Sequence, residues 1–151
     1  MRTIKFRGKS LSTGEWVYGY YFVDVQETDD RMCYETLHLI QTPYGDHYQA
    51  IEVDPKTVGQ YTNYDDMNGK EIYDSDIIQI KMRKKYGHQQ EGTAIYGKVE
   101  YGEIYIKDNT LYQFSTFHIK NTSIPYVIKM EGEIIGNSHD TPELLTSPSN
   151  D

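Results

Sequence analysis

Residues 64–76, YDDMNGKEIYDSD, decide how the second half of the chain folds. They gather several carboxylates and an Asn around Gly69, directly before the strand-like run IIQIKM at 77–82. Asn-Gly is a favoured turn dipeptide, because both residues tolerate positive φ. We therefore predict that Asn68 and Gly69 form a structural turn that leads the chain into the following strand.

The same segment does not fit a calcium-binding EF-hand loop. Such a loop places oxygen ligands at positions 1, 3 and 5, a Gly at position 6 and a bidentate Glu at position 12. With Gly69 at position 6, Tyr64 falls at position 1 and Ser75 at position 12, so both anchoring carboxylates are missing. The flanking residues also alternate like strands, where an EF-hand needs two amphipathic helices.

Two-metal phosphoryl transfer requires clustered carboxylates. A metal-dependent hydrolase or nuclease is therefore one alternative function for this chain. The carboxylates it would use are Asp65, Asp66, Asp74 and Asp76. Because all four adjoin the turn, we interpret them as its solvated rim and rank this function last. We expect no metal, no other cofactor and no catalytic residue.

The consecutive residues Ser138, His139 and Asp140 do not indicate a catalytic triad. A triad is built from separated chain positions, whereas neighbours on an extended segment point to alternate sides. We expect this segment to turn the chain toward a short helical turn that Pro142 begins and Thr141 caps. The sequence also contains neither of the glycine-rich phosphate-binding motifs.

The length of 151 residues fits one domain, or two small ones that share a core. Cys33 is the single cysteine, which excludes an intramolecular disulfide framework and suits a reducing compartment. No run of about 18 apolar residues is present, and the charged start MRTIKFRGKS does not resemble a signal peptide. We expect a soluble, cytoplasmic protein that does not bind membranes.

The formal charge of −8 makes a nucleic acid an unexpected partner, because it repels a polyanion at long range. One local exception is a basic patch followed by an aromatic residue: Lys81, Arg83, Lys84, Lys85 and Tyr86. This patch could contact phosphates while the ring stacks on a base. We favour a solvated strand end, and we keep a nucleic-acid-binding barrel that uses residues 81–86 as an alternative.

The chain contains 15 tyrosines, several of them in β-type alternation. EWVYGYYF, residues 15–22, predicts a strand with Trp16, Tyr18 and Tyr20 on one face. We expect most tyrosine rings to cover sheet faces within the protein, and a residual exposed set to bind a partner.

Turn residues separate further strand-like runs along the chain. TIKFRGK and EWVYGYYF flank SLSTG, which predicts a hairpin with Gly14 in the left-handed conformation. ETLHLIQT and YQAIEV flank PYGD, and residues 24–30, DVQETDD, are interpreted as an acidic loop. GKVEY, EIYIK, YVIKM and GEIIGN complete a mainly β chain with antiparallel strands and little helix.

Four blocks of this sequence resemble the YopX family of small proteins encoded by bacteriophages and prophages. They are IKFRGK, VGQYTNYDDMNGKEIYDSDII, GKVEY and IIGNSHDTPELL, and their order matches the family from about residue 3 to residue 145. The resemblance implies a β-rich protein with a C-terminal SH3-like barrel and no known catalytic residues.

Within that resemblance, three parts of the chain are expected. Residues 1–58 form an N-terminal antiparallel β region packed on the rest, residues 59–145 form the barrel, and residues 146–151 are a frayed tail. NGKEIYDSD would lead into the first barrel strand, with Ile72 and Tyr73 closing one end of the core. Family members usually carry Gly where this chain has Ser75, so we do not expect a positive φ there, since Ser adopts it at a higher cost.

The resulting functional hypothesis is a phage or prophage accessory protein that acts by binding a phage or host protein. The exposed tyrosines or the acidic N-terminal region would make the contact, and the sequence leaves self-association open.

Overall fold

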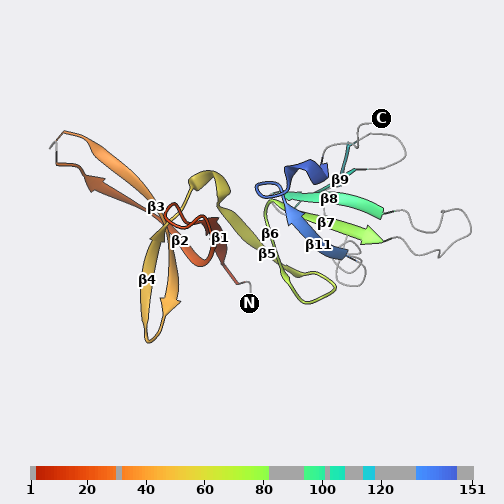
Figure 1. Ribbon diagram of the computed structural model, residues 1–151, viewed down its shortest axis with the longest axis horizontal. Helices are drawn as coiled ribbons and strands as arrows, with labels where there is room; N and C mark the ends of the chain where they lie inside the picture. Colours follow the sequence, from red (N-terminus) through yellow and green to blue (C-terminus); the bar gives the residue numbers. More distant parts are fainter. Residues whose placement is uncertain are drawn as a thin grey trace, which may run out of the picture. The chain divides into compact units, whose positions relative to one another are not determined.

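The computed structural model describes residues 3–29, 32–81, 94–100, 103–107, 114–117 and 132–145. The chain forms two compact units, Met1–Tyr61 and Thr62–Asp151. Both are built from antiparallel strands, which confirms the mainly β class with little helix (Figure 1).

Unit 1 contains four strands, a short 3-10 helix and the start of a fifth strand (Figure 1). They are β1 (Phe6–Lys9), β2 (Trp16–Glu27), β3 (Tyr34–Tyr44), β4 (His47–Glu52), η1 (Pro55–Thr57) and β5 (Gly59–Asp65). Their order across the sheet is β4-β3-β2-β1-β5, and neighbouring strands are antiparallel. The predicted β1–β2 hairpin is confirmed, with Gly14 at a φ of 73°.

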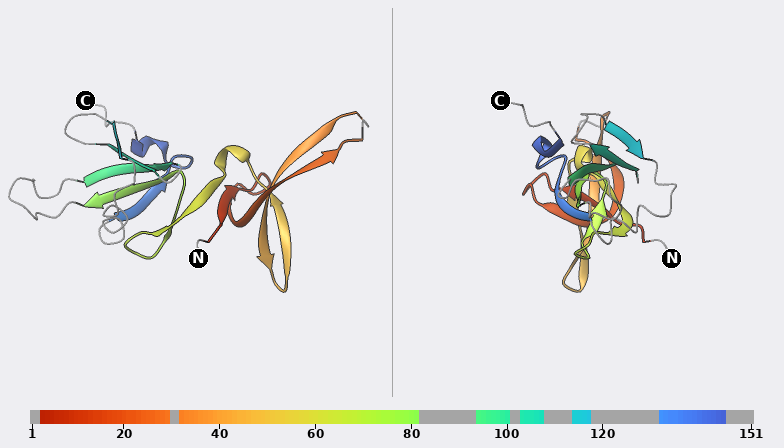
Figure 2. Two further views of the ribbon diagram at one scale, coloured as in Figure 1. Left: turned by 180° about the vertical axis from the view of Figure 1, so that it is seen from behind. Right: turned by 90° about the vertical axis from the view of Figure 1, so that its right-hand side faces the viewer.

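Strand β3 is shared by two hairpins, one formed with β2 and one with β4. Their turns lie at opposite ends of β3. Its first half pairs with β2, from Tyr34 opposite Glu27 to Gln41 opposite Tyr20. Its second half pairs with β4, from residue 39 onward. Within unit 1 the two hairpins diverge from this overlap, as Figure 1 and the left view of Figure 2 show from opposite sides.

The interpretation of residues 24–30 as an acidic loop was wrong for most of that segment. Strand β2 continues through Asp24 to Glu27, and these residues are paired with Tyr34 to Leu37 of β3. Val23 and Val25 alternate with polar residues, and their β-branched side chains favour the extended conformation. The prediction of a loop considered only the carboxylates of this segment.

The core of unit 1 is small and centres on Ile40 and Val53, both fully buried. Gly8 lies against them, because a Cβ at this position would be 3.1 Å from Val53 Cβ. Gly19 is constrained more severely, since a Cβ there would clash with the carbonyl oxygen of Gln41. Glycine therefore allows the backbones of β2 and β3 to approach closely at this point.

Unit 2 consists of the end of β5, six further strands and a final 3-10 turn. The elements are β6 (Glu71–Tyr73), β7 (Asp76–Lys81), β8 (Ala94–Glu100), β9 (Glu103–Lys107), β10 (Phe114–Phe117), β11 (Gly132–Asn137) and η2 (Pro142–Leu145). Five of them form a sheet in the order β10-β9-β8-β7-β11. Among the residues that the structure describes, no pairing joins β10 to β11, and the described strands do not show a closed barrel.

The buried apolar residues of unit 2 that the structure describes lie on β6 and β7. Ile72 and Tyr73 of β6 are buried, as predicted, and so are the neighbouring Ile77 and Ile78 of β7. Burial of consecutive residues means that both faces of these strands are covered at this point. The predicted strand-like run IIQIKM is confirmed from Ile77 to Lys81 as part of β7, and Met82 lies outside the described residues.

The expectation for Ser75 was wrong. Ser75 has a φ of 76°, in the left-handed region that costs a residue with a Cβ about 1–2 kcal/mol. Its carbonyl oxygen accepts a hydrogen bond from Ser138 N–H at 2.8 Å. The tight connection from β6 to β7 and the hydrogen bond from Ser138 hold Ser75 in this conformation.

Two predicted segments, the strand YVIKM and the tail at 146–151, lie outside the described residues. No helix in the described part of the chain is long and apolar enough to cross a membrane.

Candidate interaction surface

The Asn68-Gly69 turn is a three-residue hairpin loop between β5 and β6. Gly69 N–H donates to the carbonyl oxygen of Asp66 at 3.0 Å, and Asp66 N–H donates to the carbonyl oxygen of Lys70 at 2.9 Å. Gly69 has a φ of 78°, which fits a type I turn followed by a left-handed residue. The predicted structural turn is confirmed, with Gly69 as its left-handed position.

The carboxylate of Asp66 organises this turn from inside. Its Oδ1 accepts hydrogen bonds from the N–H groups of Asn68 and Lys70, each at 2.9 Å. Its Oδ2 accepts a third from Ile134 N–H of β11 at 3.1 Å, and Met67 N–H donates to Gly132 O at 2.8 Å. Asp66 therefore holds the turn against a strand that is distant in sequence.

The interpretation of the four aspartates as a solvated rim was wrong for two of them. Asp66 and Asp76 are both buried, whereas Asp65 and Asp74 are half-buried. Asp76 Oδ2 accepts a hydrogen bond from Tyr73 N–H at 2.8 Å, across the turn that contains Ser75. Buried carboxylates need such partners, since an unpaired buried charge is costly.

In the part of the chain that the structure describes, no three His, Cys, Asp or Glu side chains come close enough together to hold a metal ion. The oxygens of Asp66 and Asp76 instead accept backbone N–H groups. Backbone hydrogen bonds of this kind give the two carboxylates a role in folding.

The segment NSHD is organised by Asn137, which the sequence analysis did not single out. Asn137 Oδ1 accepts hydrogen bonds from the N–H groups of His139 and Asp140, and its Nδ2 donates to Asp140 Oδ2 at 2.9 Å. The predicted turn toward Pro142 is confirmed. Thr141 differs from the prediction, because its hydroxyl donates back to the carbonyl oxygen of Asn137 and accepts from Asn137 N–H.

The predicted basic patch falls almost entirely outside the described residues. Lys81 ends β7, and residues 82–93 follow it. The patch of Lys81, Arg83, Lys84, Lys85 and Tyr86 thus stays a prediction.

The clearest exposed feature lies in unit 1, on one face of β2. Tyr18, Tyr20 and Phe22 alternate along the strand and are 41%, 62% and 39% exposed. Trp16 precedes them on the same face, so the predicted placement of Trp16, Tyr18 and Tyr20 agrees with the register. We call Trp16, Tyr18, Tyr20 and Phe22 the aromatic row.

The expectation that most tyrosine rings cover sheet faces was wrong for the described side chains. Six of nine are exposed: Tyr18, Tyr20, Tyr34, Tyr44, Tyr48 and Tyr64. Five of the six lie in unit 1, where the described residues of the diverging hairpins have no second layer that covers both faces. Exposed aromatic rings at this density are typical of surfaces that bind proteins.

Two cationic side chains lie over Trp16, the first residue of the aromatic row. The guanidinium carbon of Arg7 lies 4.5 Å from the centre of the Trp16 ring, and Lys9 Nζ lies 5.6 Å from it. Such contacts hold the indole in place by cation–π attraction. Trp16 is half-buried, which leaves Tyr18, Tyr20 and Phe22 as the accessible part of the row.

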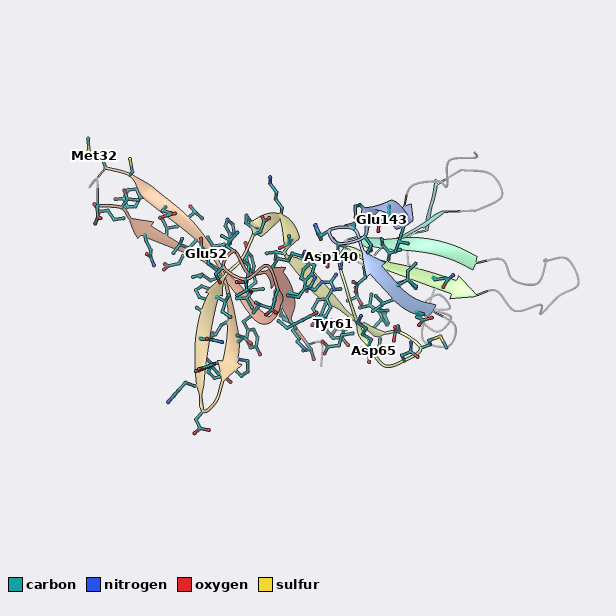
Figure 3. All side chains as sticks on the ribbon, in the orientation of Figure 1. Met32, Glu52, Tyr61, Asp65, Asp140 and Glu143 are labelled. Carbon is teal, nitrogen blue, oxygen red and sulfur yellow. The ribbon has the colours of Figure 1, made fainter. Side chains whose placement is uncertain are left out.

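The other end of the row continues into the hairpin of residues 22–38, which we call the long hairpin. Met32 lies at its far end, and Glu52 of β4 lies near its base (Figure 3). The long hairpin carries Asp24, Glu27 and Glu35 on its strands, and no Lys or Arg is found among its described residues. The surface of unit 1 therefore changes from aromatic to acidic along β2.

Comparison with known proteins assigns the chain to a family. This fold is a helix-poor assembly of antiparallel strands, and the family model described as YopX protein matches residues 5–146. The chain belongs to the YopX family, as its sequence blocks led us to expect. A search of curated proteins found no match.

Among solved structures, the chain is similar to protein EF1440 from Enterococcus faecalis. The two are 20% identical, the match covers 97% of this chain and 100% of that chain, and the TM-score is 0.45.

Proposed function

We propose that this chain is a non-catalytic, protein-binding accessory protein of phage type that acts inside a bacterial host. The observation that carries the proposal is the accessible part of the aromatic row. Tyr18, Tyr20 and Phe22 expose large rings on one face of a regular strand. A monomeric protein rarely exposes such rings side by side unless they serve an interaction.

The composition of this surface supports a protein partner. Tyrosine rings provide a large rigid contact area at a low cost in side-chain entropy, and their hydroxyl groups stay hydrated. The register places Leu39 opposite Phe22 and Gln41 opposite Tyr20, so apolar and polar groups continue onto β3. A mixed surface of this kind is characteristic of protein interfaces whose partners also exist separately.

The test uses two matched double variants of the full chain as bait. Tyr18→Ser with Tyr20→Ser removes two rings of the aromatic row, whereas Tyr44→Ser with Tyr64→Ser removes two similarly exposed rings elsewhere. Each bait is incubated with lysate of bacteria that carry the active phage or prophage. Captured proteins are then quantified by mass spectrometry against beads without bait.

We expect at least one protein to be captured equally by the parent and by the Tyr44/Tyr64 variant, and to be lost with the Tyr18/Tyr20 variant. Equal capture by both variants would contradict the role of the aromatic row. Circular dichroism of each variant checks that unit 1 remains folded.

We also propose that unit 2 is a small barrel of the SH3-like type. Its five-stranded sheet runs β10-β9-β8-β7-β11, and the first four of these strands follow one another in the sequence. Closure would remove the sheet edges that otherwise invite aggregation. Amide exchange and inter-strand contacts measured by NMR would test closure, because an open sheet lacks contacts between its two edge strands.

A further inference from the structure

One edge of the long hairpin has no strand beside it among the described residues. Strand β1 pairs with β2 only from Trp16 to Gly19, and β2 continues for eight further residues alongside β3. The opposite edge of β2 is therefore open over most of residues 20–27. An open edge presents unpaired N–H and C=O groups to which another strand can be added.

Two hydrogen bonds show which residues of β2 face this edge. Thr28 N–H donates to the carbonyl oxygen of Cys33 at 2.9 Å, so the even-numbered residues of β2 direct their backbone groups toward β3. On β3, the carbonyl oxygen of His38 accepts from Val53 N–H, away from β2. Because backbone direction alternates along an antiparallel strand, Val23, Val25 and Glu27 point to the open edge.

The two faces of the long hairpin differ in chemistry. Asp24 and Glu35 lie on one face, where Gln26 donates a hydrogen bond to Asp24 at 2.9 Å. Val23, Val25 and Tyr34 lie on the other face, which also carries Glu27 opposite Tyr34. Val25 and Tyr34 are 60% and 70% exposed. A strand added at the open edge would meet the Asp24 carboxylate on one side, and on the other side Val23 and Val25, followed by Glu27 at the end of β2.

The negative charge of the long hairpin limits which partner can bind at the open edge. Residues 22–38 contain five Asp and Glu against one Arg, about half of the net charge of the chain. A basic segment would be attracted to this hairpin, and an acidic one would be repelled. Two copies of the chain that paired edge to edge would bring two acidic hairpins together, which like-charge repulsion opposes.

We propose that the β2 edge from Val23 to Glu27 binds a basic, extended segment of a protein partner as an additional strand. The proposal rests on the proposed function, because it specifies how the first unit engages its partner. Val23, Val25 and Glu27 supply the main-chain hydrogen bonds. Partner residues opposite Val23 and Val25 are apolar, and the Lys or Arg side chains between them face Asp24 and Glu35.

This geometry predicts an alternating sequence in the partner, which a peptide can reproduce. The probe is fluorophore-labelled acetyl-KVKVKVK-amide, and its control is acetyl-KKKKVVV-amide, which has the same composition without the alternation. Binding to the full chain is followed by fluorescence anisotropy at physiological salt. A third peptide, N-methylated on alternate residues, cannot form the edge hydrogen bonds.

Two variants of the chain test the edge itself. Val25→Pro removes an N–H that points outward, so the hydrogen bonds between β2 and β3 are kept. Asp24→Lys reverses the charge beside the added strand, and Glu52→Lys on β4 makes the same charge change outside the long hairpin. Circular dichroism confirms that each variant is folded.

We expect the alternating peptide to bind at least about tenfold more tightly than the block and N-methylated peptides, which share its charge. Val25→Pro and Asp24→Lys should each weaken binding about tenfold, and Glu52→Lys about twofold at most. Equal binding of the alternating and block peptides would overturn the proposal, because charge alone would then explain the affinity. The proposal would also be overturned if the alternating peptide did not bind at millimolar concentration. A dimer of the chain that Val25→Pro dissociates would overturn it as well, because the edge would then bind a second copy.

The two proposals can be tested independently, because different variants remove the aromatic row and the β2 edge. If Tyr18→Ser with Tyr20→Ser abolishes capture from lysate while Val25→Pro leaves it intact, unit 1 binds its partner through the aromatic row and the strand-addition proposal fails.

Discussion

The Asp66 carboxylate and the Ile134 N–H, 68 residues apart in sequence, are joined by a hydrogen bond of 3.1 Å. The same carboxylate accepts the N–H groups of Asn68 and Lys70. One buried side chain therefore holds a local turn and fastens that turn to β11. This polar turn is thus part of the framework of unit 2.

Replacing Asp66 by Asn should destabilise the protein by about 2 kcal/mol, because hydrogen bonds to a charged group contribute roughly 1.5–3 kcal/mol. The Asn side chain offers one acceptor oxygen, and its NH₂ group would face an N–H donor. Denaturation by guanidinium chloride, followed by circular dichroism, measures the change. Asn68→Ala is the matched control, since it keeps the backbone N–H that Asp66 accepts.

Asn68→Ala should change the free energy of unfolding by no more than about 0.5 kcal/mol, as is usual for exposed positions. If Asp66→Asn were equally mild, the buried carboxylate would not be needed to hold the turn.

Gly69→Val should cost about 1–3 kcal/mol, because a β-branched residue is strained at the φ of 78° observed there. Space is not the reason, since a Cβ at this position would meet no atom within 4 Å. Gly69→Asn should cost less than Gly69→Val, because Asn tolerates the left-handed conformation. Equal stability of the Val variant and the parent in the same denaturation experiment would refute this explanation.

Ser75→Gly should stabilise the protein, by about 0.5–1 kcal/mol. Glycine removes the left-handed strain of roughly 1–2 kcal/mol, and the greater freedom of the unfolded chain offsets part of that gain. The thermal unfolding midpoint should rise accordingly. A lower midpoint would mean that the Ser75 side chain contributes more than the strained backbone costs.

The sequence was sufficient for the elements that alternation and turn residues define. The β1–β2 hairpin, the Gly69 turn and β7 were all predicted, because Gly14, Gly69 and the run IIQIKM have strong local preferences. The placement of Trp16, Tyr18 and Tyr20 on one face followed from period two alone.

Tertiary relationships were not accessible in this way. The burial of Asp66 depends on Ile134, and the left-handed Ser75 depends on a contact with Ser138. The exposure of the tyrosines depends on the absence of a covering layer in unit 1, which a single sequence does not reveal. A signal for Asp66 was present, since an Asp two residues before Asn-Gly is typical of a side-chain-stabilised turn.

Nucleic acid should not bind this chain near physiological salt, because the net charge of −8 repels it. At low salt, weak binding that falls steeply with ionic strength is the expected behaviour of the basic patch. Fluorescence anisotropy with labelled single- and double-stranded oligonucleotides checks both statements. A submicromolar complex at physiological salt, lost when Arg83, Lys84 and Lys85 are changed to Ala, would favour the nucleic-acid-binding alternative.

The most direct measurement of the binding edge is residue-resolved amide hydrogen exchange by NMR, on the free chain and with the alternating peptide. In the free chain, the amides of Val23 and Val25 should exchange faster than those of Asp24 and Gln26, which face β3. Peptide binding should slow Val23 and Val25 selectively. Equal protection of all four amides in the free chain, or no change at Val23 and Val25 with bound peptide, would contradict an open edge that binds a partner strand.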